Sequence, residues 1–353
     1  MESIDEQIKN NRRKFRVDHF DMVISEYMAR ANSGDLILNP PYQRLFRWNS
    51  KTQSALIESI LIGIPLPPIF VFQNNDAKWE IIDGVQRTNT LINFLSEDLK
   101  MTFEGCDILT ELNGKTFDQL PEKTRRYVNN SRIRIELIEE TDDIFGQYLM
   151  FNRLNSNGEK LEPQEIRNFL IYKLNKSFYD KIQDLCQIDV FRDSISLKED
   201  RIKKQEDVEY MIKFFLGREL SSKDKVEKYS TIDDLITKEI DIYLKKYDNH
   251  YLNKEFTIFE KTFEIIYKIW GKNAFRYYQN KINSIANTFS MAIGISFVLD
   301  RINFDKDKEK IIKIGERYFE SDKYKSISNR GYSPTKRMYE LNKYCREFFT
   351  KYV

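Results

Sequence analysis

Apolar residues repeat with two different periods in the first third of the chain. Over residues 56–64 they recur at helical spacing, Asn49 and Ser50 are good caps for the start of a helix, and Gly63 is a good end. The prolines at 65, 67 and 68 then impose an extended path. Residues 69–72 and 78–82 flank a polar turn and predict two buried strands, the second returning along the first.

The rest of the pattern predicts a mixed domain followed by helices. The other expected elements are an amphipathic helix from Asp18 to about Arg30, a brief strand over 36–38, a helix after Gly84, a strand with one wet face over 132–138, a helix over 144–154 and a helix beginning at Pro163. Beyond about Tyr172 the pattern is almost entirely helical. We therefore expect an α+β fold, with a small mixed α/β domain over residues 1–172 and an all-helical domain over residues 173–353.

Composition supports folded domains and shows a difference in charge between the two halves. Apolar residues make up 41% and aromatic residues 14% of the 353 residues, which is enough for a proper core. The formal net charge is only +2, but residues 1–170 carry 21 Lys and Arg against 26 Asp and Glu, and the remainder carries 36 against 29. A basic second half is compatible with nucleic-acid contact, and a Lys-rich solvated surface explains it equally.

Cysteine use and hydropathy indicate a cytoplasmic protein. Cys106, Cys186 and Cys345 are widely separated, odd in number and without metal-ligand spacing, as in a reduced intracellular protein. The first residues contain no apolar stretch, so we expect no signal peptide. The longest apolar run, residues 60–72, is interrupted by glycine and prolines and cannot span a bilayer as a helix. We expect no membrane partner.

The sequence Asp83-Gly84-Val85-Gln86-Arg87 carries the strongest chemical pattern. A buried strand ends here, glycine makes the turn and a helix begins, and a helix N-terminus suits phosphate oxygens because its N–H groups and dipole face them. Arg87 adds a planar five-donor fork in the first helical turn. A carboxylate such as Asp83 suits this place if a metal or an attacking water lies between it and the phosphate. The structural alternative is that Asp83 caps the helix and Arg87 is an ordinary surface residue.

Two further segments combine amide, basic and aromatic residues. Tyr42-Gln43-Arg44 stands on a proline-led turn with Trp48 close behind, and this cluster forms either a ligand wall or a loop anchored by its aromatic rings. Residues 151–158 end a helix with Arg153 and Asn155 among several amides, and alone they would be an ordinary helix C-terminus with Gly158 in the left-handed position.

Together these segments resemble the N-terminal domain of GmrSD-type restriction enzymes. That family looks like ParB and sulfiredoxin in fold and is marked by an Asp-Gly-Gln-Gln-Arg motif. The matching residues are Tyr42-Gln43-Arg44 with Trp48, residues 56–67, Ile82 to Arg87, and residues 151–156 with Leu161, Gln164 and Glu165. The resemblance covers about residues 18–172 and has its four motifs in the right order.

The resemblance implies a nucleoside-triphosphate pocket in a bacterial restriction or antiphage-defence system, where nucleotide hydrolysis controls a nuclease. Its phosphates would be held by Arg44, Gln86, Arg87 and the helix start at Gly84, and Tyr42, Gln43, Arg153 and Asn155 would line the pocket. Asp83 and Arg87 would be the catalytic residues, with Asp83 positioning Mg²⁺ or the attacking water. These implications describe a metal-dependent NTPase.

The sequence departs from the family pattern in ways that keep a second hypothesis open. Val85 stands where the first glutamine of the motif usually lies, which puts hydrolysis in doubt. His19 and His250 are isolated, so we expect no His-Asn-His nuclease domain and no nuclease activity of this chain. The alternative is a module that senses a nucleotide without hydrolysing it.

Expected partners follow from both hypotheses. They are a nucleoside triphosphate, DNA bound by the helical domain, and a nuclease subunit encoded separately, with a homo-oligomer left open. Basic and aromatic residues alternate over residues 267–278 and 323–351, as they do on nucleic-acid surfaces, although aromatic residues at helical spacing also form cores.

Overall fold

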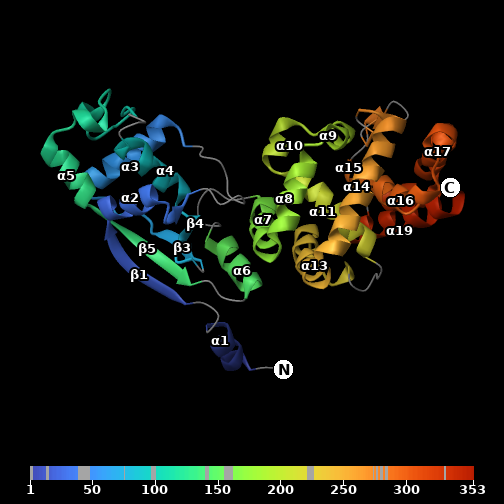
Figure 1. Cartoon of the computed structure of the whole chain (residues 1–353), viewed down its shortest axis with the longest axis horizontal. Helices are drawn as coiled ribbons and strands as arrows, with labels where there is room; N and C mark the ends of the chain where they lie inside the picture. Colours follow the sequence, from blue (N-terminus) through green and yellow to red (C-terminus); the bar gives the residue numbers. More distant parts are fainter. Residues whose placement is uncertain are drawn as a thin grey trace. The chain divides into compact units, whose positions relative to one another are not determined.

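The computed structural model describes most of the chain, which divides into two compact units, Met1–Leu161 and Glu162–Val353 (Figure 1). The described residues are 3–12, 16–38, 48–74, 76–96, 101–139, 143–154, 162–220, 226–272, 274–275, 277–278, 281–282, 285–329 and 331–353.

The first unit combines helices with a five-stranded sheet. Its elements are α1 (Ile4–Arg12), β1 (Val17–Val23), α2 (Ile24–Ser33), β2 (Leu36–Ile37), α3 (Ser50–Ile62), β3 (Ile69–Gln73), β4 (Trp79–Asp83), α4 (Val85–Leu95), α5 (Glu122–Asn130), β5 (Arg132–Glu139) and α6 (Ile144–Leu154), with short 3₁₀ turns at Thr110–Leu112 and Phe117–Gln119. The strand order is β1-β5-β3-β4-β2. The β1–β5 and β3–β4 pairs are antiparallel, whereas β5–β3 and β4–β2 are parallel.

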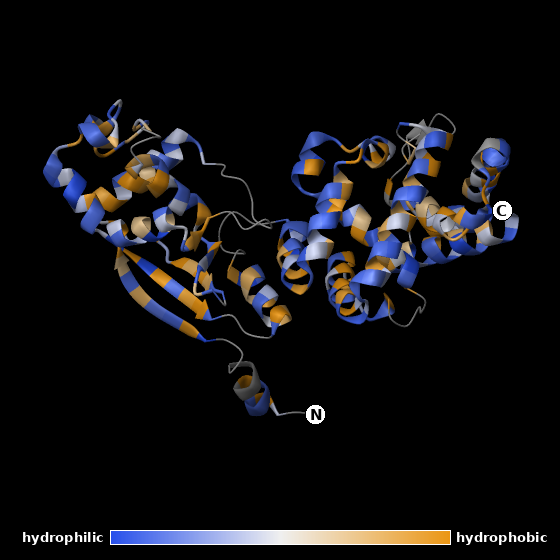
Figure 2. Cartoon of the chain, viewed as in Figure 1, coloured by the Kyte–Doolittle hydropathy of each residue, from blue (hydrophilic) through white to orange (hydrophobic). Residues whose placement is uncertain are grey.

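Helices α2 to α5 lie on one side of this sheet and form the main core with it (Figure 1). Ile69, Val71, Ile81 and Ile135 of the central strands are almost fully buried against them. Hydrophobic and hydrophilic residues alternate along β1 and β5 (Figure 2), as expected of strands with two different faces. The predicted strand pair over residues 69–82 is confirmed as the antiparallel β3–β4 hairpin.

One predicted element is wrong. Residues 18–23, expected to open a helix, belong instead to strand β1, and α2 begins only at Ile24. The pattern there has a period of two, because Phe20 and Met22 contribute to the core while Asp21 is exposed and pairs with Arg134 of β5 at 2.9 Å. Pairing with β5 over the whole length of the strand therefore outweighs the weak helical pattern that continues into α2.

The second unit is almost entirely helical. Its elements are α7 (Pro163–Leu174), α8 (Lys176–Cys186), α9 (Asp189–Ile195), α10 (Glu199–Lys203), α11 (Glu206–Glu219), α13 (Ile232–Lys246), α14 (Asn249–Trp270), β6 (Tyr277–Tyr278), β7 (Lys281–Ile282), α15 (Ile285–Thr288), α16 (Ser290–Ser296), a 3₁₀ turn at Leu299–Arg301, α17 (Phe304–Glu320), α18 (Asp322–Ser328) and α19 (Pro334–Tyr352). An aromatic core joins α8, α11 and α14, with Phe178 5.6 Å from Phe215 and Phe214 5.2 Å from Phe259 between ring centroids. The α+β fold class is confirmed.

Helix α7 lies in the second unit, so the boundary at Leu161 falls before the expected position at residue 172. The helix starts as predicted, because the Glu165 carboxylate accepts a hydrogen bond from the Glu162 N–H at 2.8 Å and Pro163 occupies the first turn. Its fully buried Arg167 donates to Glu209 of α11 at 2.6 Å and to Asp233 of α13 at 2.9 Å. These ion pairs of the buried Arg167 tie α7 to the helices that follow it.

Candidate functional site

The motif of residues 83–87 forms the corner between β4 and α4. Asp83 is the last residue of β4 and Gly84 is the N-cap of α4, with φ of 104° and ψ of 7°. This left-handed conformation suits glycine, since other residues are strained there. Glycine also has no side chain that could cap the helix, so no N-cap side chain occupies the first N–H groups of α4.

Buried groups on the core side of the corner fix its conformation. A Cβ atom on Gly84 would lie 3.0 Å from Cγ1 and 3.2 Å from Cγ2 of Ile69, so a larger residue fits here only if the Ile69 side chain of β3 shifts. The Thr88 hydroxyl donates to the Gly84 carbonyl at 3.0 Å and shares a 2.8 Å hydrogen bond with the Tyr27 hydroxyl of α2. Because Tyr27 and Thr88 are both fully buried, the corner is held rigidly against the core.

Arg87 is mostly buried and connects β4 to the segment before β3 by hydrogen bonds, so it is not an ordinary surface residue. Its Nη2 donates to Oδ2 of Asp83 at 2.8 Å, and its Nη1 donates to the carbonyl oxygens of Pro67 and, at 3.0 Å, Pro68. The Arg87 side chain is only 12% exposed, whereas that of Asp83 is 36% exposed. Burial lowers the pKa of Arg87, and the Asp83 carboxylate opposes this shift.

Gln86 holds the main chain at the end of the segment that carries Tyr42-Gln43-Arg44. Its Oε1 accepts a hydrogen bond from the Trp48 N–H at 3.2 Å. On the other side, Nε2 of Gln53 donates to the Trp48 carbonyl at 3.0 Å, and Nδ2 of Asn93 donates to Oε1 of Gln53 at 2.9 Å. Three side-chain amides from α3 and α4 thus fix the peptide groups of Trp48.

The structure brings together four of the predicted site residues: Asp83, Gly84, Gln86 and Arg87. Arg153 lies in the last turn of α6 with an exposed side chain. Tyr42, Gln43, Arg44 and Asn155 lie outside the described residues. The structural alternative for Asp83 fails, because the N-cap is Gly84 and the Asp83 carboxylate pairs with Arg87 instead.

The corner offers one carboxylate to a cation. Within the described parts of the chain, no group of three or more His, Cys, Asp or Glu side chains could hold a metal ion. Mg²⁺ is commonly bound through one or two carboxylates together with substrate phosphates and water, so it needs no such cluster. The half-exposed Asp83 fits this role only as one ligand among several, and its Oδ2 already accepts from Arg87.

Sequence reasoning missed Tyr27, Thr88, Gln53 and Asn93, which position the corner and the peptide groups of Trp48. Tyr27 and Thr88 are 61 residues apart, and nothing in the local pattern links them. Gln53 and Asn93 gave no separate indication, since α3 and α4 each contain several other polar residues. Their hydrogen-bond network depends on how the two helices pack, and the local pattern does not specify it.

Comparison with known proteins gives one result. Residues 24–172 match the model of the family described as GmrSD restriction endonuclease, N-terminal domain. No curated protein and no solved structure matches the chain. In the described residues, no helix has the length and apolar character needed to cross a membrane. The matched segment contains the whole β4–α4 corner together with α2, α3 and α6. Residues 24–172 of this chain are therefore similar to the N-terminal domain of GmrSD restriction endonucleases.

Proposed function

We propose that the β4–α4 corner binds the phosphates of a nucleoside triphosphate and hydrolyses it, and that this reaction controls a DNA-directed effector. The family match over residues 24–172 supports a role as a component of a restriction system. The observation that carries the proposal is Gly84, whose left-handed backbone and contact with Ile69 leave the start of α4 without a capping side chain. Such a helix start presents N–H donors to an anion.

The proposed roles follow from exposure and hydrogen bonding. The α4 N-terminus contacts the phosphates, and the half-exposed Asp83 positions the attacking water or a metal. Arg87 orients Asp83 and holds the carbonyls of Pro67 and Pro68, so its contribution to phosphate binding is through the shape of the corner as well as its charge. Bound Mg²⁺ would neutralise phosphate charge here. Gln86 fixes the peptide of Trp48. Tyr42, Gln43, Arg44, Arg153 and Asn155 are proposed as further ligand contacts on the family resemblance alone.

Two substitutions test these roles. Asp83→Asn keeps the size of the side chain and is expected to abolish turnover while a nucleotide still raises the melting temperature. Arg87→Ala is expected to weaken nucleotide binding and also to lower stability, because the partly buried carbonyl of Pro68 loses its donor. Asp118→Asn, at an exposed position in the 106–120 region, is the matched control and should change neither property.

The measurements are phosphate release and thermal stability with each of the four ribonucleoside triphosphates, with and without magnesium. Turnover and a stability increase in the unmodified protein, both dependent on the corner, support the proposal. Absence of both for all four nucleotides would contradict it. Turnover that survives Asp83→Asn would remove Asp83 from the mechanism.

A second candidate is a nucleotide sensor that does not hydrolyse its ligand. The 2.8 Å pair between Asp83 and Arg87 favours it, because a carboxylate oxygen that already accepts from a guanidinium is less available to a metal or to an attacking water. Val85 in place of the usual glutamine favours it as well. Thermal stabilisation by a nucleotide without any phosphate release identifies this case.

DNA is the proposed partner of the helical unit. In residues 323–351, Tyr339 and Phe349 are core residues, but Lys343, Arg346 and Lys351 are exposed on α19. In residues 267–278, Phe275 is also buried. Duplex DNA affinity that falls steeply with salt, and falls again on replacing these three basic residues by glutamate, supports this role. Affinity that does not depend on salt contradicts it.

A further inference from the structure

Strand β1 leaves one edge of the five-stranded sheet open. It lies at the border of the sheet, and among the described residues it has a strand partner, β5, on one side only (Figure 1). The strand at the other border, β2, has only two residues and offers no comparable edge. An edge strand of seven residues presents a row of unpaired N–H and C=O groups to another chain.

The hydrogen bonds at the two ends of β1 show which of its residues face outward. The Glu139 N–H donates to the Arg16 carbonyl at 3.1 Å, and the Ile24 N–H donates to the Ser131 carbonyl at 2.9 Å. Because bonded and non-bonded pairs alternate in an antiparallel ladder, the even-numbered residues of β1 bond to β5. The odd-numbered residues therefore point their N–H and C=O groups away from the sheet: Val17, His19, Asp21 and Val23.

Several features that protect edge strands from pairing are missing from β1. It contains no lysine and no proline, and its ladder with β5 runs without a bulge. One local contact protects the edge, since the His19 N–H donates to the Asp18 carboxylate at 2.8 Å. This bond is exposed and joins neighbouring residues, so a carbonyl from another strand can replace it at little cost. The two aspartates of β1 would repel an acidic strand, so a partner must place other groups opposite them.

We propose that the outer edge of β1 pairs antiparallel with the same edge of a second copy of the chain, which joins the two sheets into one. The two-fold axis passes beside Phe20, so Val17 faces Val23 and His19 faces Asp21 of the second copy. All four outward-facing residues then lie in hydrogen-bonded pairs, with about eight bonds in total. Such a contact is closed and symmetric, as in the commonest class of dimer.

The side chains of β1 are complementary to themselves in this register. On one face, His19 of each copy lies opposite Asp21 of the other. On the other face, the partly buried Phe20 side chains meet at the centre, in a non-hydrogen-bonded pair, where side chains approach most closely. A shift by two residues would place Asp21 opposite Asp21, or His19 opposite His19. The sequence of β1 therefore favours one register.

Neighbouring residues of β5 extend the pattern. Asp21 pairs with Arg134 at 2.9 Å, and His19 is paired with Glu136 in the β1–β5 ladder. In the joined sheet, Glu136 and His19 of one copy are followed in the same row by Asp21 and Arg134 of the second copy. Acidic and basic side chains alternate along this row, whereas like charges directly opposite each other would destabilise it. The charges thus identify a second copy as the partner of this edge.

The elements around β1 leave its outer edge accessible. Helix α2 follows β1 and contacts α5 and β2, and β2 lies at the opposite border of the sheet. The chain therefore turns away from the free edge when it leaves β1. Val17, Asp18, His19 and Asp21 are exposed, which shows that no described element covers them.

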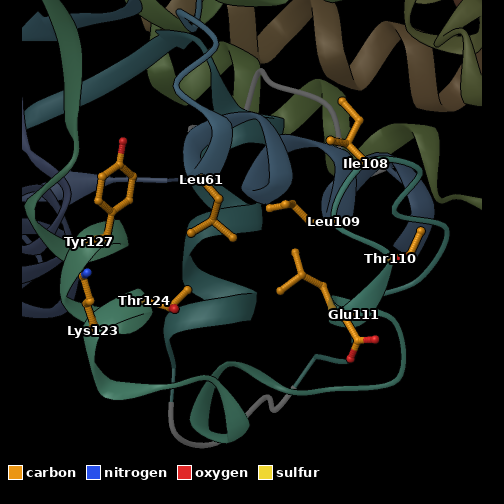
Figure 3. Close-up of a pocket in the computed structure, with 9 residues that line it drawn as sticks. Leu61, Ile108, Leu109, Thr110, Glu111, Lys123, Thr124 and Tyr127 are labelled. Carbon is orange, nitrogen blue, oxygen red and sulfur yellow. The ribbon is translucent and has the colours of Figure 1, made fainter.

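Another exposed surface of the first unit does not identify a partner in this way. It is a groove of about 520 Å³ in which Leu61 lies between Tyr127 and Leu109 (Figure 3). Glu111 and Lys123 both line it, so its charges select neither an acidic nor a basic partner. The self-complementary charges of β1 have no counterpart there.

Molar mass by light scattering or sedimentation, over a range of concentrations, tests the proposal. We expect the unmodified chain to form a dimer. His19→Pro should weaken association about tenfold or more, because it removes an outward donor and places a ring at the edge while the bonds to β5 remain. Asp118→Lys, at an exposed position away from β1, is the control and should associate like the unmodified chain. Circular dichroism and the melting temperature show whether each variant is folded.

Two charge variants provide the decisive test. His19→Asp places an aspartate opposite Asp21 of the second copy, and Asp21→Lys places a lysine opposite His19, so each variant alone should associate weakly. Both positions are exposed, so both variants should fold. In a mixture the introduced lysine faces the introduced aspartate and the native His19 faces the native Asp21, so a mixed dimer should form. A monomeric unmodified chain, a dimer that His19→Pro leaves unchanged, or a mixture that does not associate would each overturn the proposal.

Discussion

Replacing Gly84 by alanine tests how the corner is built. The left-handed conformation costs an alanine about 1–2 kcal/mol. The new Cβ would also lie 3.0 and 3.2 Å from two carbons of Ile69, closer than the ordinary contact of about 3.5–4.0 Å, and such overpacking costs about 1–3 kcal/mol. We therefore expect Gly84→Ala to lower the free energy of unfolding of the first unit by about 2–5 kcal/mol.

Gly63 provides the matched control, because it has φ of 79° and a Cβ there would meet nothing within 4 Å. Gly63→Ala should cost only the backbone part, about 1–2 kcal/mol. The steric part can be measured separately in a double-mutant cycle with Ile69→Ala, which removes both close carbons. Although Ile69→Ala is itself destabilising by about 2–5 kcal/mol, its coupling with Gly84→Ala should recover about 1–3 kcal/mol.

Urea unfolding followed by tryptophan fluorescence is the appropriate assay. Trp270 lies in the second unit, and a Trp270→Phe background leaves Trp48 and Trp79 to report on the first unit alone, which matters because a chain of two units need not unfold in one step. A cost for Gly84→Ala no greater than that for Gly63→Ala, or no coupling with Ile69, would refute this account of the corner.

Two further predictions concern buried polar groups. Thr88→Val should lower the free energy of unfolding by about 1–3 kcal/mol because it leaves the buried Tyr27 hydroxyl without its partner, and Tyr27→Phe in the same chain should recover part of that loss; additive costs in urea unfolding would contradict this. Burial raises the pKa of Glu209, but Lys213 and Arg167 lower it more, so the net pKa lies below its ordinary value of 4.5. Stability from Glu209 is therefore complete above about pH 4.5 and is lost as the pH falls through the lower folded pKa. The stability difference between the unmodified chain and Glu209→Gln should shrink over that range in denaturant unfolding, and a constant difference would argue against the ion pairs.

The sequence was sufficient to predict most elements of the first unit and the position of the corner. Asn49, Gly63 and the prolines that follow clearly mark where elements begin and end. The ends of α3, β3, β4 and α4 were therefore predicted nearly correctly. Strand β1 was mistaken for a helix because a seven-residue edge strand passes directly into α2, and only its partner β5 reveals the difference.

The internal contacts of the site could not be predicted in the same way. The Asp83–Arg87 spacing is visible in the sequence, but Arg87 also contacts the carbonyls of Pro67 and Pro68, which depend on the path between α3 and β3. Similarly, the Gln86–Trp48 contact joins residues 38 positions apart. Sequence patterns locate side chains on elements, whereas these contacts depend on how the elements pack.

The pairing of Asp83 with Arg87 has a consequence for how a ligand arrives. Two opposite charges 2.8 Å apart cancel each other at a distance, so this corner exerts little attraction on an anion that is still several water layers away. Recognition there depends on short-range fit to main-chain donors, and the capture rate at this corner should change little when salt is added. Binding at this corner then depends mainly on the shape of the ligand and on the positions of its acceptor atoms, and less on its net charge.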